Sequence, residues 1–161
     1  MPFKKIFQRT PSLGSLPEDG FGRTEFTHAI LRHQTQKALS LLKHYSEINH
    51  RDNGGYSDLY FAAQSCEVEI VRELLRRGAD PNIETYAGGT PLIAALDSVQ
   101  RHSHREEIDS YECAFEMIKL LLEAGANPDK KSKSGSTARQ LAKYMAPGKI
   151  ADYLQGFPKS V

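Results

Sequence analysis

A glycine recurs at a fixed interval along this chain of 161 residues, and the interval constrains the fold more than any other feature. Gly22, Gly55 and Gly88 are 33 residues apart (55 − 22 and 88 − 55), and Gly135 follows 47 residues later (135 − 88). The stretches behind the glycines share one frame: Thr24 to Ala29, Ser57 to Ala62, Thr90 to Ala95 and Thr137 to Ala142. A period of this length is typical of arrays in which each repeat is one supersecondary unit. The sequence therefore predicts four stacked repeats.

Apolar residues with helical spacing follow each of the first three stretches. They stand at i, i+3 and i+4, which is one face of a helix: Ala38, Leu41 and Leu42; Val71, Leu74 and Leu75; Ile118, Leu121 and Leu122. Gly78 and Gly125 come after two of these helices, where a helix end favours a left-handed residue without a Cβ. Each repeat is thus expected to hold two helices, with Leu74 and Leu121 in the core of the stack.

The third stretch, Thr90-Pro91-Leu92-Ile93-Ala94-Ala95, resembles the T-P-L-H-x-A core of the ankyrin-repeat family. The resemblance implies an all-α solenoid of helix-turn-helix units with short β-turn fingers. It also implies a protein that binds a partner rather than an enzyme. The chain departs from the family in lacking the histidine, whose hydrogen bonds join neighbouring repeats. The residues in its place are Thr27, Tyr60, Ile93 and Gln140.

The chain is expected to divide into a flexible N-terminal tail over residues 1–19 and a repeat domain over 20–157. The repeats start near residues 20, 53, 86 and 133, and the third carries an insertion of 14 residues (47 − 33) within 96–115. Neither proline nor glycine interrupts that stretch, so both helices of the third repeat should be longer than usual. They would project from the stack with His102 to Arg105 near the tip, either as part of a binding face or as a solvated spacer.

Composition excludes several classes of protein. The 21 lysines and arginines nearly balance the 20 aspartates and glutamates, which argues against global attraction to nucleic acid or to anionic membranes. Neither a membrane-spanning apolar run nor a signal peptide is present, so we predict a cytoplasmic protein that is a monomer when free. Cys66 and Cys113 lie in different repeats and are expected to be separate thiols rather than a disulfide or a metal pair.

Candidate catalytic and metal-binding residues are few. His102 and His104, with acidic neighbours, could ligate zinc, but residues i and i+2 of a helix point about 200° apart. None of the common nucleophile or phosphate-loop motifs occurs. We therefore predict no catalytic residue, no cofactor and no metal, and a metal-dependent enzyme is the least favoured alternative.

A basic run marks the C-terminal repeat. Its members fall in a twenty-residue span that contains no acidic residue: Lys130, Lys131, Lys133, Arg139, Lys143 and Lys149. Such a run could meet the phosphates of a nucleic acid, solubilise the end of the stack, or bind an acidic protein. We favour an acidic protein partner because it agrees with the family resemblance, and we keep nucleic-acid binding as the alternative.

The resemblance also implies where the partner binds, in a concave groove made by the turn tips and the first helix of each repeat. Family contact positions fall on twelve residues here: Arg23, Arg32, Arg51, Asn53, Tyr56, Gln64, Glu84, Tyr86, Asp97, Lys131, Lys133 and Tyr144. Tyrosine and arginine dominate interface hot spots, so Tyr56 and Tyr86 are expected to be exposed anchors. The predicted function is a stand-alone protein-binding module that masks or scaffolds its partner, as an inhibitor or immunity-type protein does.

Overall fold

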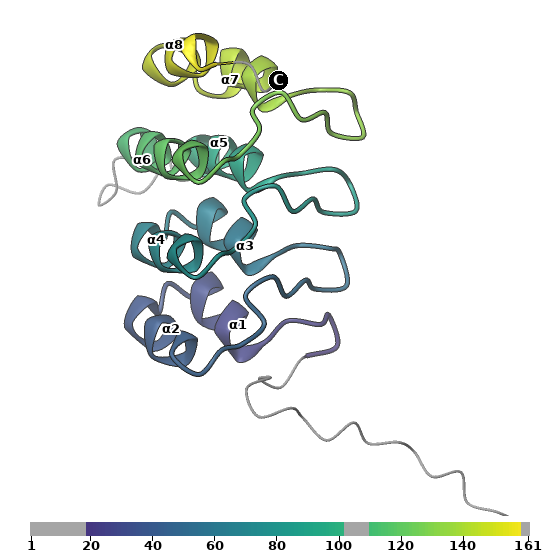
Figure 1. The fold of residues 1–161 in the computed structure, drawn as a ribbon, viewed down its shortest axis with the longest axis vertical. Helices are drawn as coiled ribbons and strands as arrows, with labels where there is room; N and C mark the ends of the chain where they lie inside the picture. The colour runs from purple at the N-terminus through teal and green to yellow at the C-terminus, as the bar shows by residue number, and fades with distance from the viewer. Residues whose placement is uncertain (1–18, 102–109, 159–161) are drawn as a thin grey trace, which may run out of the picture.

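The helices of the chain stack in pairs along one axis (Figure 1). The computed structural model describes residues 19–101 and 110–158. Within these residues the helices are α1 (Glu25–Leu31), α2 (Thr35–Leu42), α3 (Asp58–Gln64), α4 (Val68–Arg76), α5 (Pro91–Arg101), α6 (Ser110–Glu123), α7 (Ala138–Met145) and α8 (Lys149–Gly156). Strands are absent from the described residues, and the predicted all-α solenoid is confirmed.

Each first helix begins at a hydroxyl side chain, which accepts a hydrogen bond from a backbone amide that the helix leaves unpaired. The side chain of Thr24 accepts from the amide of Thr27, and that of Ser57 accepts from the amide of Tyr60. Thr137 plays this part for α7 together with Gln140, in a reciprocal capping box. Helices of seven or eight residues are too short to persist alone in water, so their stability comes from packing.

Packing runs from each repeat to the next. Helix α3 contacts α1 and α5, α5 contacts α7, and α4 contacts α2 and α6. Leu74 and Leu121 have no exposed surface, which confirms the predicted repeat frame. The largest fully buried side chains are Phe26, Ile30, Leu42, Leu59, Ile70, Leu74, Leu92, Leu96, Met117, Ile118, Leu121 and Ile150.

The third repeat has the longest helices, as predicted. Helix α5 has 11 residues and α6 has 14, against seven to nine in the other repeats. Residues 102–109, which include His102 to Arg105, lie outside the described residues, as do residues 1–18 of the predicted tail. The projecting shape and the role of the insertion therefore stay predictions.

The turn before each first helix forms a finger, and the fingers stack on the side of the first helices (Figure 1). The recurring glycines Gly22, Gly55, Gly88 and Gly135 all have a left-handed backbone, with φ between 75° and 83°. One backbone hydrogen bond joins each finger to the next. These bonds run from Asn53 N to Phe21 O (2.9 Å), Tyr86 N to Gly54 O (3.1 Å) and Lys133 N to Ala87 O (3.4 Å).

A buried carboxyl group joins the first repeat to the second. The hydroxyl of Thr27 donates to Asp58 Oδ1 at 2.6 Å, and the hydroxyl of Tyr45 donates to Asp58 Oδ2 at 2.7 Å. Burial raises the pKa of Asp58, and the two hydroxyl donors oppose that rise. Thr27 occupies the position of the family's histidine, so other residues here replace the missing link between the repeats.

The two cysteines form a disulfide, so the expectation of separate thiols is wrong. Cys66 lies between α3 and α4, and Cys113 lies in α6 of the next repeat, with 6.2 Å between their Cα atoms. That separation is within the range that a disulfide spans. Their sequence separation is 47, which equals the offset between Val71 and Ile118 in the second helices of the same two repeats. Stacking therefore brings together two residues at the same place in successive repeats.

The fingers approach so closely that Gly88 has no room for a side chain. A Cβ added there would lie 2.6 Å from Lys133 N, whereas a Cβ at Gly135, with nearly the same φ, would meet nothing within 4 Å. Gly135→Ala should lower the free energy of unfolding by about 1–2 kcal/mol, through backbone strain alone. Gly88→Ala should cost at least about 1 kcal/mol more, because the fourth finger must shift. Urea titration of the two variants measures both costs, and equal costs would contradict the close approach.

Candidate functional site

A row of side chains projects from equivalent positions of three successive fingers. Asn53, Tyr86 and Lys133 are the residues whose amides join each finger to the one before it. All three are exposed, and Tyr86 keeps 61 % of its surface accessible. Because the backbone bonds fix the spacing of the fingers, the row is a preorganised surface. All three residues belong to the predicted contact set.

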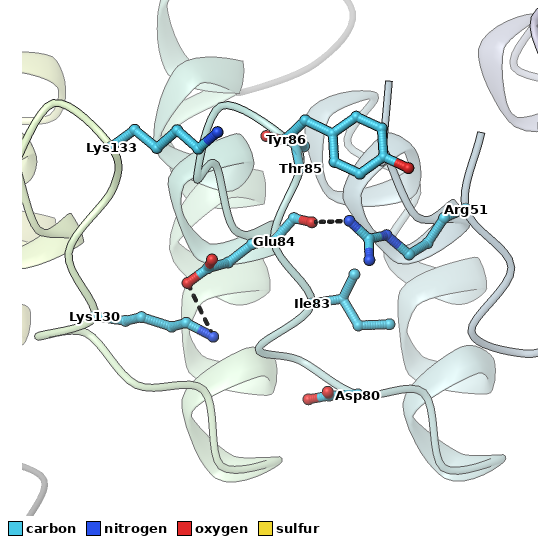
Figure 2. A pocket seen from close by; sticks show the side chains of 8 residues that line it. All are labelled: Arg51, Asp80, Ile83, Glu84, Thr85, Tyr86, Lys130 and Lys133. Atoms are coloured by element: carbon cyan, nitrogen blue, oxygen red, sulfur yellow. Dashed lines mark hydrogen bonds and ion pairs between the residues drawn. The ribbon is translucent and has the colours of Figure 1, made fainter. Parts of the chain in front are cut away.

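Arg51 lies beside this row and is held by neutral groups. Its Nη2 donates to Glu84 O at 2.8 Å and its Nε donates to Gly55 O at 3.2 Å. Its guanidinium carbon lies 5.2 Å from the centre of the Tyr86 ring, in a cation–π contact (Figure 2). The structure thus brings together three predicted site residues, Arg51, Glu84 and Tyr86.

These residues line an open pocket of about 460 Å³ between the second, third and fourth fingers. Lys130 Nζ lies 3.1 Å from Glu84 Oε1, so the fourth repeat supplies the counter-ion of the third (Figure 2). Lys133 points toward the pocket from the next finger (Figure 2). The pocket is lined by Arg51, Asp80, Ile83, Glu84, Thr85, Tyr86, Lys130 and Lys133.

On the first helices, two predicted contact residues bind each other. Gln64 Nε2 donates to Asp97 Oδ2 at 3.1 Å, from α3 to α5. Both side chains are half-buried. A partner that contacts this part of the surface would therefore meet an existing hydrogen bond between repeats.

In the first repeat, Arg23 is partly engaged within the protein. Its Nε lies 3.3 Å from the buried Asp52 carboxylate, and its guanidinium carbon lies 5.3 Å from the centre of the Phe21 ring and 5.4 Å from that of Phe61. Arg32 is exposed and lines a separate pocket with Arg23 at the N-terminal end of the stack. The structure does not place these arginines in the pocket around Arg51.

Tyr56 is not the exposed anchor that the sequence predicts. Its ring is half-buried and lies 4.9 Å from the ring of Tyr60 and 5.5 Å from that of Phe61, measured between centroids. The aromatic neighbours come from α3, so Tyr56 fixes its finger to the helix below it. Phe21, which sequence reasoning missed, is 66 % exposed in the first finger. Its place immediately before the first recurring glycine is the signal that could have found it.

Several cations of the basic run in the fourth repeat are paired with acidic residues, which the sequence alone does not indicate. The side chain of Arg139 is mostly buried, pairs with Asp129 at 2.7 Å and also donates to the carbonyl of Leu154. Lys149 pairs with Glu112 at 3.1 Å. Lys131 and Tyr144, both in the predicted set, are exposed, and Tyr144 keeps 83 % of its surface accessible.

Within residues 19–101 and 110–158, histidine, cysteine and acidic side chains form no cluster of three that could hold a metal ion. His102 and His104, the pair considered for zinc, lie outside the described residues. Of the helices in that same part of the chain, none is long and apolar enough to cross a membrane.

The comparisons with known proteins agree with this architecture. The family model of the ankyrin repeat matches residues 59–86, which run from α3 through α4 into the third finger. An ankyrin repeat protein of Acanthamoeba polyphaga mimivirus is 38 % identical over 60 residues, which are 35 % of this chain and 10 % of the relative. Alpha-latrotoxin-Lg1a of Latrodectus geometricus is 33 % identical over 89 residues, 53 % of this chain and 6 % of the toxin.

An ankyrin repeat protein of Fowlpox virus is 32 % identical over 68 residues, 41 % of this chain and 13 % of the relative. Residues 59–86 therefore match an ankyrin repeat, and the chain is similar to ankyrin repeat proteins; such repeats are protein-protein interaction modules. The chain spans about a tenth of the length of these relatives.

The different surroundings of Tyr56 and Tyr86 predict different costs of substitution. Tyr56→Ala should lower the free energy of unfolding by about 2 kcal/mol or more, because it removes packing against two rings. Tyr86→Ala should cost less than about 1 kcal/mol, because the ring is 61 % exposed and its contact with Arg51 lies at the surface. Denaturant titration of the two variants checks this, and a larger cost at Tyr86 would contradict the assignment of Tyr56 as structural.

Proposed function

We propose that the chain binds a partner protein through the fingers and first helices of its repeats. The observation that carries the proposal is the row of exposed Asn53, Tyr86 and Lys133, held at a fixed spacing by backbone bonds between the fingers. A rigid row with an exposed tyrosine has little conformational entropy to lose on binding. The cations Arg51, Lys131 and Lys133 favour a partner with an acidic epitope.

Binding itself is the proposed output, so the chain would mask or scaffold its partner without changing it chemically. Ankyrin repeats are generally non-catalytic binding modules, which supports a role without enzymatic activity. An inhibitor or immunity-type role is the most specific version of this proposal. In it, the finger row would cover a functional surface of the partner, and the free chain would be a monomer.

Nucleic-acid binding through the fourth repeat is the weaker candidate. It would need a continuous row of cations along a phosphate backbone. Arg139 and Lys149 are instead paired with acidic residues, and Lys130 is paired with Glu84. The exposed Lys131, Lys133 and Lys143 are left for such a role.

Cytoplasmic localisation also stays a proposal. Separate thiols would have supported it, but the disulfide between Cys66 and Cys113 takes that support away. Disulfides persist mainly in oxidising compartments, although some intracellular proteins carry them. Labelling of free thiols in cell extracts prepared under acid quench would report the state of this pair.

Capture of a partner by the purified chain, identified by mass spectrometry, tests the proposed function. With that partner, Tyr86→Ala should weaken binding by about 1–2 kcal/mol in titration calorimetry, as a hot spot does. Lys131→Gln should mainly slow association and reduce its dependence on salt, as a charge at the edge of an interface does.

Arg72→Gln is a suitable control, because Arg72 is exposed on α4, away from the fingers, and pairs with Glu116. Unchanged affinity in Tyr86→Ala would reject the finger row as the binding surface. Stronger binding to generic DNA than to any protein, abolished by moderate salt, would favour the nucleic-acid alternative.

A further inference from the structure

We propose that the pocket around Arg51 and Tyr86 is an anchor subsite that receives one acidic side chain, aspartate or glutamate, of a partner protein. This inference rests on the proposed function and names the group that the finger surface recognises. Arg51 would bind the carboxylate with its outer edge, Lys133 would add a second positive charge, and Tyr86 would cover the methylene groups of the acidic residue.

Arg51 is oriented for this task before any partner arrives. One edge of its guanidinium group, Nε and Nη2, is occupied by the carbonyls of Gly55 and Glu84 at 3.2 and 2.8 Å. The Nη1 amino group has no partner among the described residues, so the outer edge formed by Nη1 and Nη2 can donate a pair of parallel hydrogen bonds. A carboxylate accepts such a pair with both oxygens.

The positive charge of Arg51 is not neutralised by the groups that hold it. Carbonyl oxygens and a tyrosine ring are neutral, so they orient the guanidinium group and leave its charge available. Asp52, which is adjacent to Arg51 in the sequence, pairs with Arg23. Glu84, whose backbone carbonyl accepts from Arg51, has its own counter-ion in Lys130 at 3.1 Å. Lys130 is fixed further by a bond of 2.8 Å to Asn82 O.

Charge differs between the two ends of the pocket. Asp80 lies at the end away from Tyr86 and Lys133 (Figure 2), and its carboxylate accepts from Asn82 N at 2.8 Å. The finger end holds Lys133, whose side chain has no partner within residues 19–101 and 110–158. An anion is therefore favoured at the finger end and disfavoured near Asp80.

A carboxylate fits this end better than a phosphate. The two parallel donors of one guanidinium edge match the two oxygens of a carboxylate. A phosphate monoester would bring a third oxygen and a second charge, and the third cation that lines the pocket, Lys130, is already paired with Glu84. A nucleic acid would also carry neighbouring phosphates past the carboxylates of Glu84 and Asp80, which line the same pocket.

The subsite can be tested with a capped hexaglutamate peptide, without a natural partner. We expect a titration followed by nuclear magnetic resonance of the nitrogen-15-labelled chain to shift the amides of Arg51 and Tyr86 in a saturable way. Arg51→Gln should weaken this binding by about fivefold or more, and Arg51→Lys should weaken it nearly as much, because lysine keeps the charge but lacks the paired donors. Lys143→Gln, which removes one charge outside the pocket, should change it by less than about twofold.

Arg51 also joins two fingers, so unfolding curves of its variants must accompany the titration. If Arg51→Gln is less stable than the parent chain, Lys133→Gln serves as the second variant and should weaken binding by about two- to threefold. Equal losses in Arg51→Gln and Lys143→Gln, or full binding by Arg51→Lys, would overturn the paired-donor subsite. A stronger shift of the same amides by an oligothymidylate at equal salt would also overturn it.

The two proposals fail separately. Absence of peptide binding, with a captured partner that still depends on Tyr86, would reject the acidic anchor and leave the finger surface in place. Peptide binding at Arg51, with no partner sensitive to the finger row, would leave the subsite in place and reject the wider surface.

Discussion

Each helix pair of this chain buries its apolar face by stacking on the pair before and after it, and the rest of the structure depends on that constraint. Leu74 is fully buried although α4 has only nine residues, because α2 and α6 pack on either side. Such stability is a sum over neighbours rather than the property of one central core. The buried apolar residues must therefore keep the positions at which one repeat packs on the next.

The candidate binding surface follows from that register. Once the helix pairs are stacked, the fingers approach within hydrogen-bonding distance, and the amides of Asn53, Tyr86 and Lys133 each bond to the finger before them. The same step that fixes the backbone places the three side chains in a row. Within this fold, a change of finger side chain can alter the surface without altering the stack, provided that glycines such as Gly88 are kept.

Period and apolar spacing predict most of the fold, because both depend on local chain geometry. The recurring glycines, the buried Leu74 and Leu121, and the long α5 and α6 were all accessible in this way. The surroundings of a site residue were harder to predict from the sequence, because they depend on which neighbouring residue its side chain contacts. Tyr56 turns toward Phe61 and is half-buried, whereas Tyr86 in the next finger extends beside Arg51.

A rule for pairs would have recovered part of what was missed. Residues one repeat apart are neighbours in a stack, and Gln64 and Asp97, separated by 33 residues, are hydrogen-bonded. The same rule with the longer offset of 47 points to Cys66 and Cys113. The pairing of Arg139, by contrast, does not follow the rule that residues one repeat apart are neighbours. Arg139 is buried against Asp129 and the end of α8, through contacts between residues that are nearer in the sequence than one repeat.

The disulfide makes one interface between repeats harder to open than the others. In a solenoid each repeat contacts only its neighbours, so the interface between any two repeats can open separately. The bond between Cys66 and Cys113 closes a covalent ring across one junction, between the second and third repeats, and removes chain entropy from any state in which that junction opens. Opening under load should then begin at the junctions that lack such a bond. Tyr86 lies in the third finger, which belongs to one of the two repeats that the disulfide joins. The oxidised chain would therefore present Tyr86 on a pair of repeats that is covalently held together.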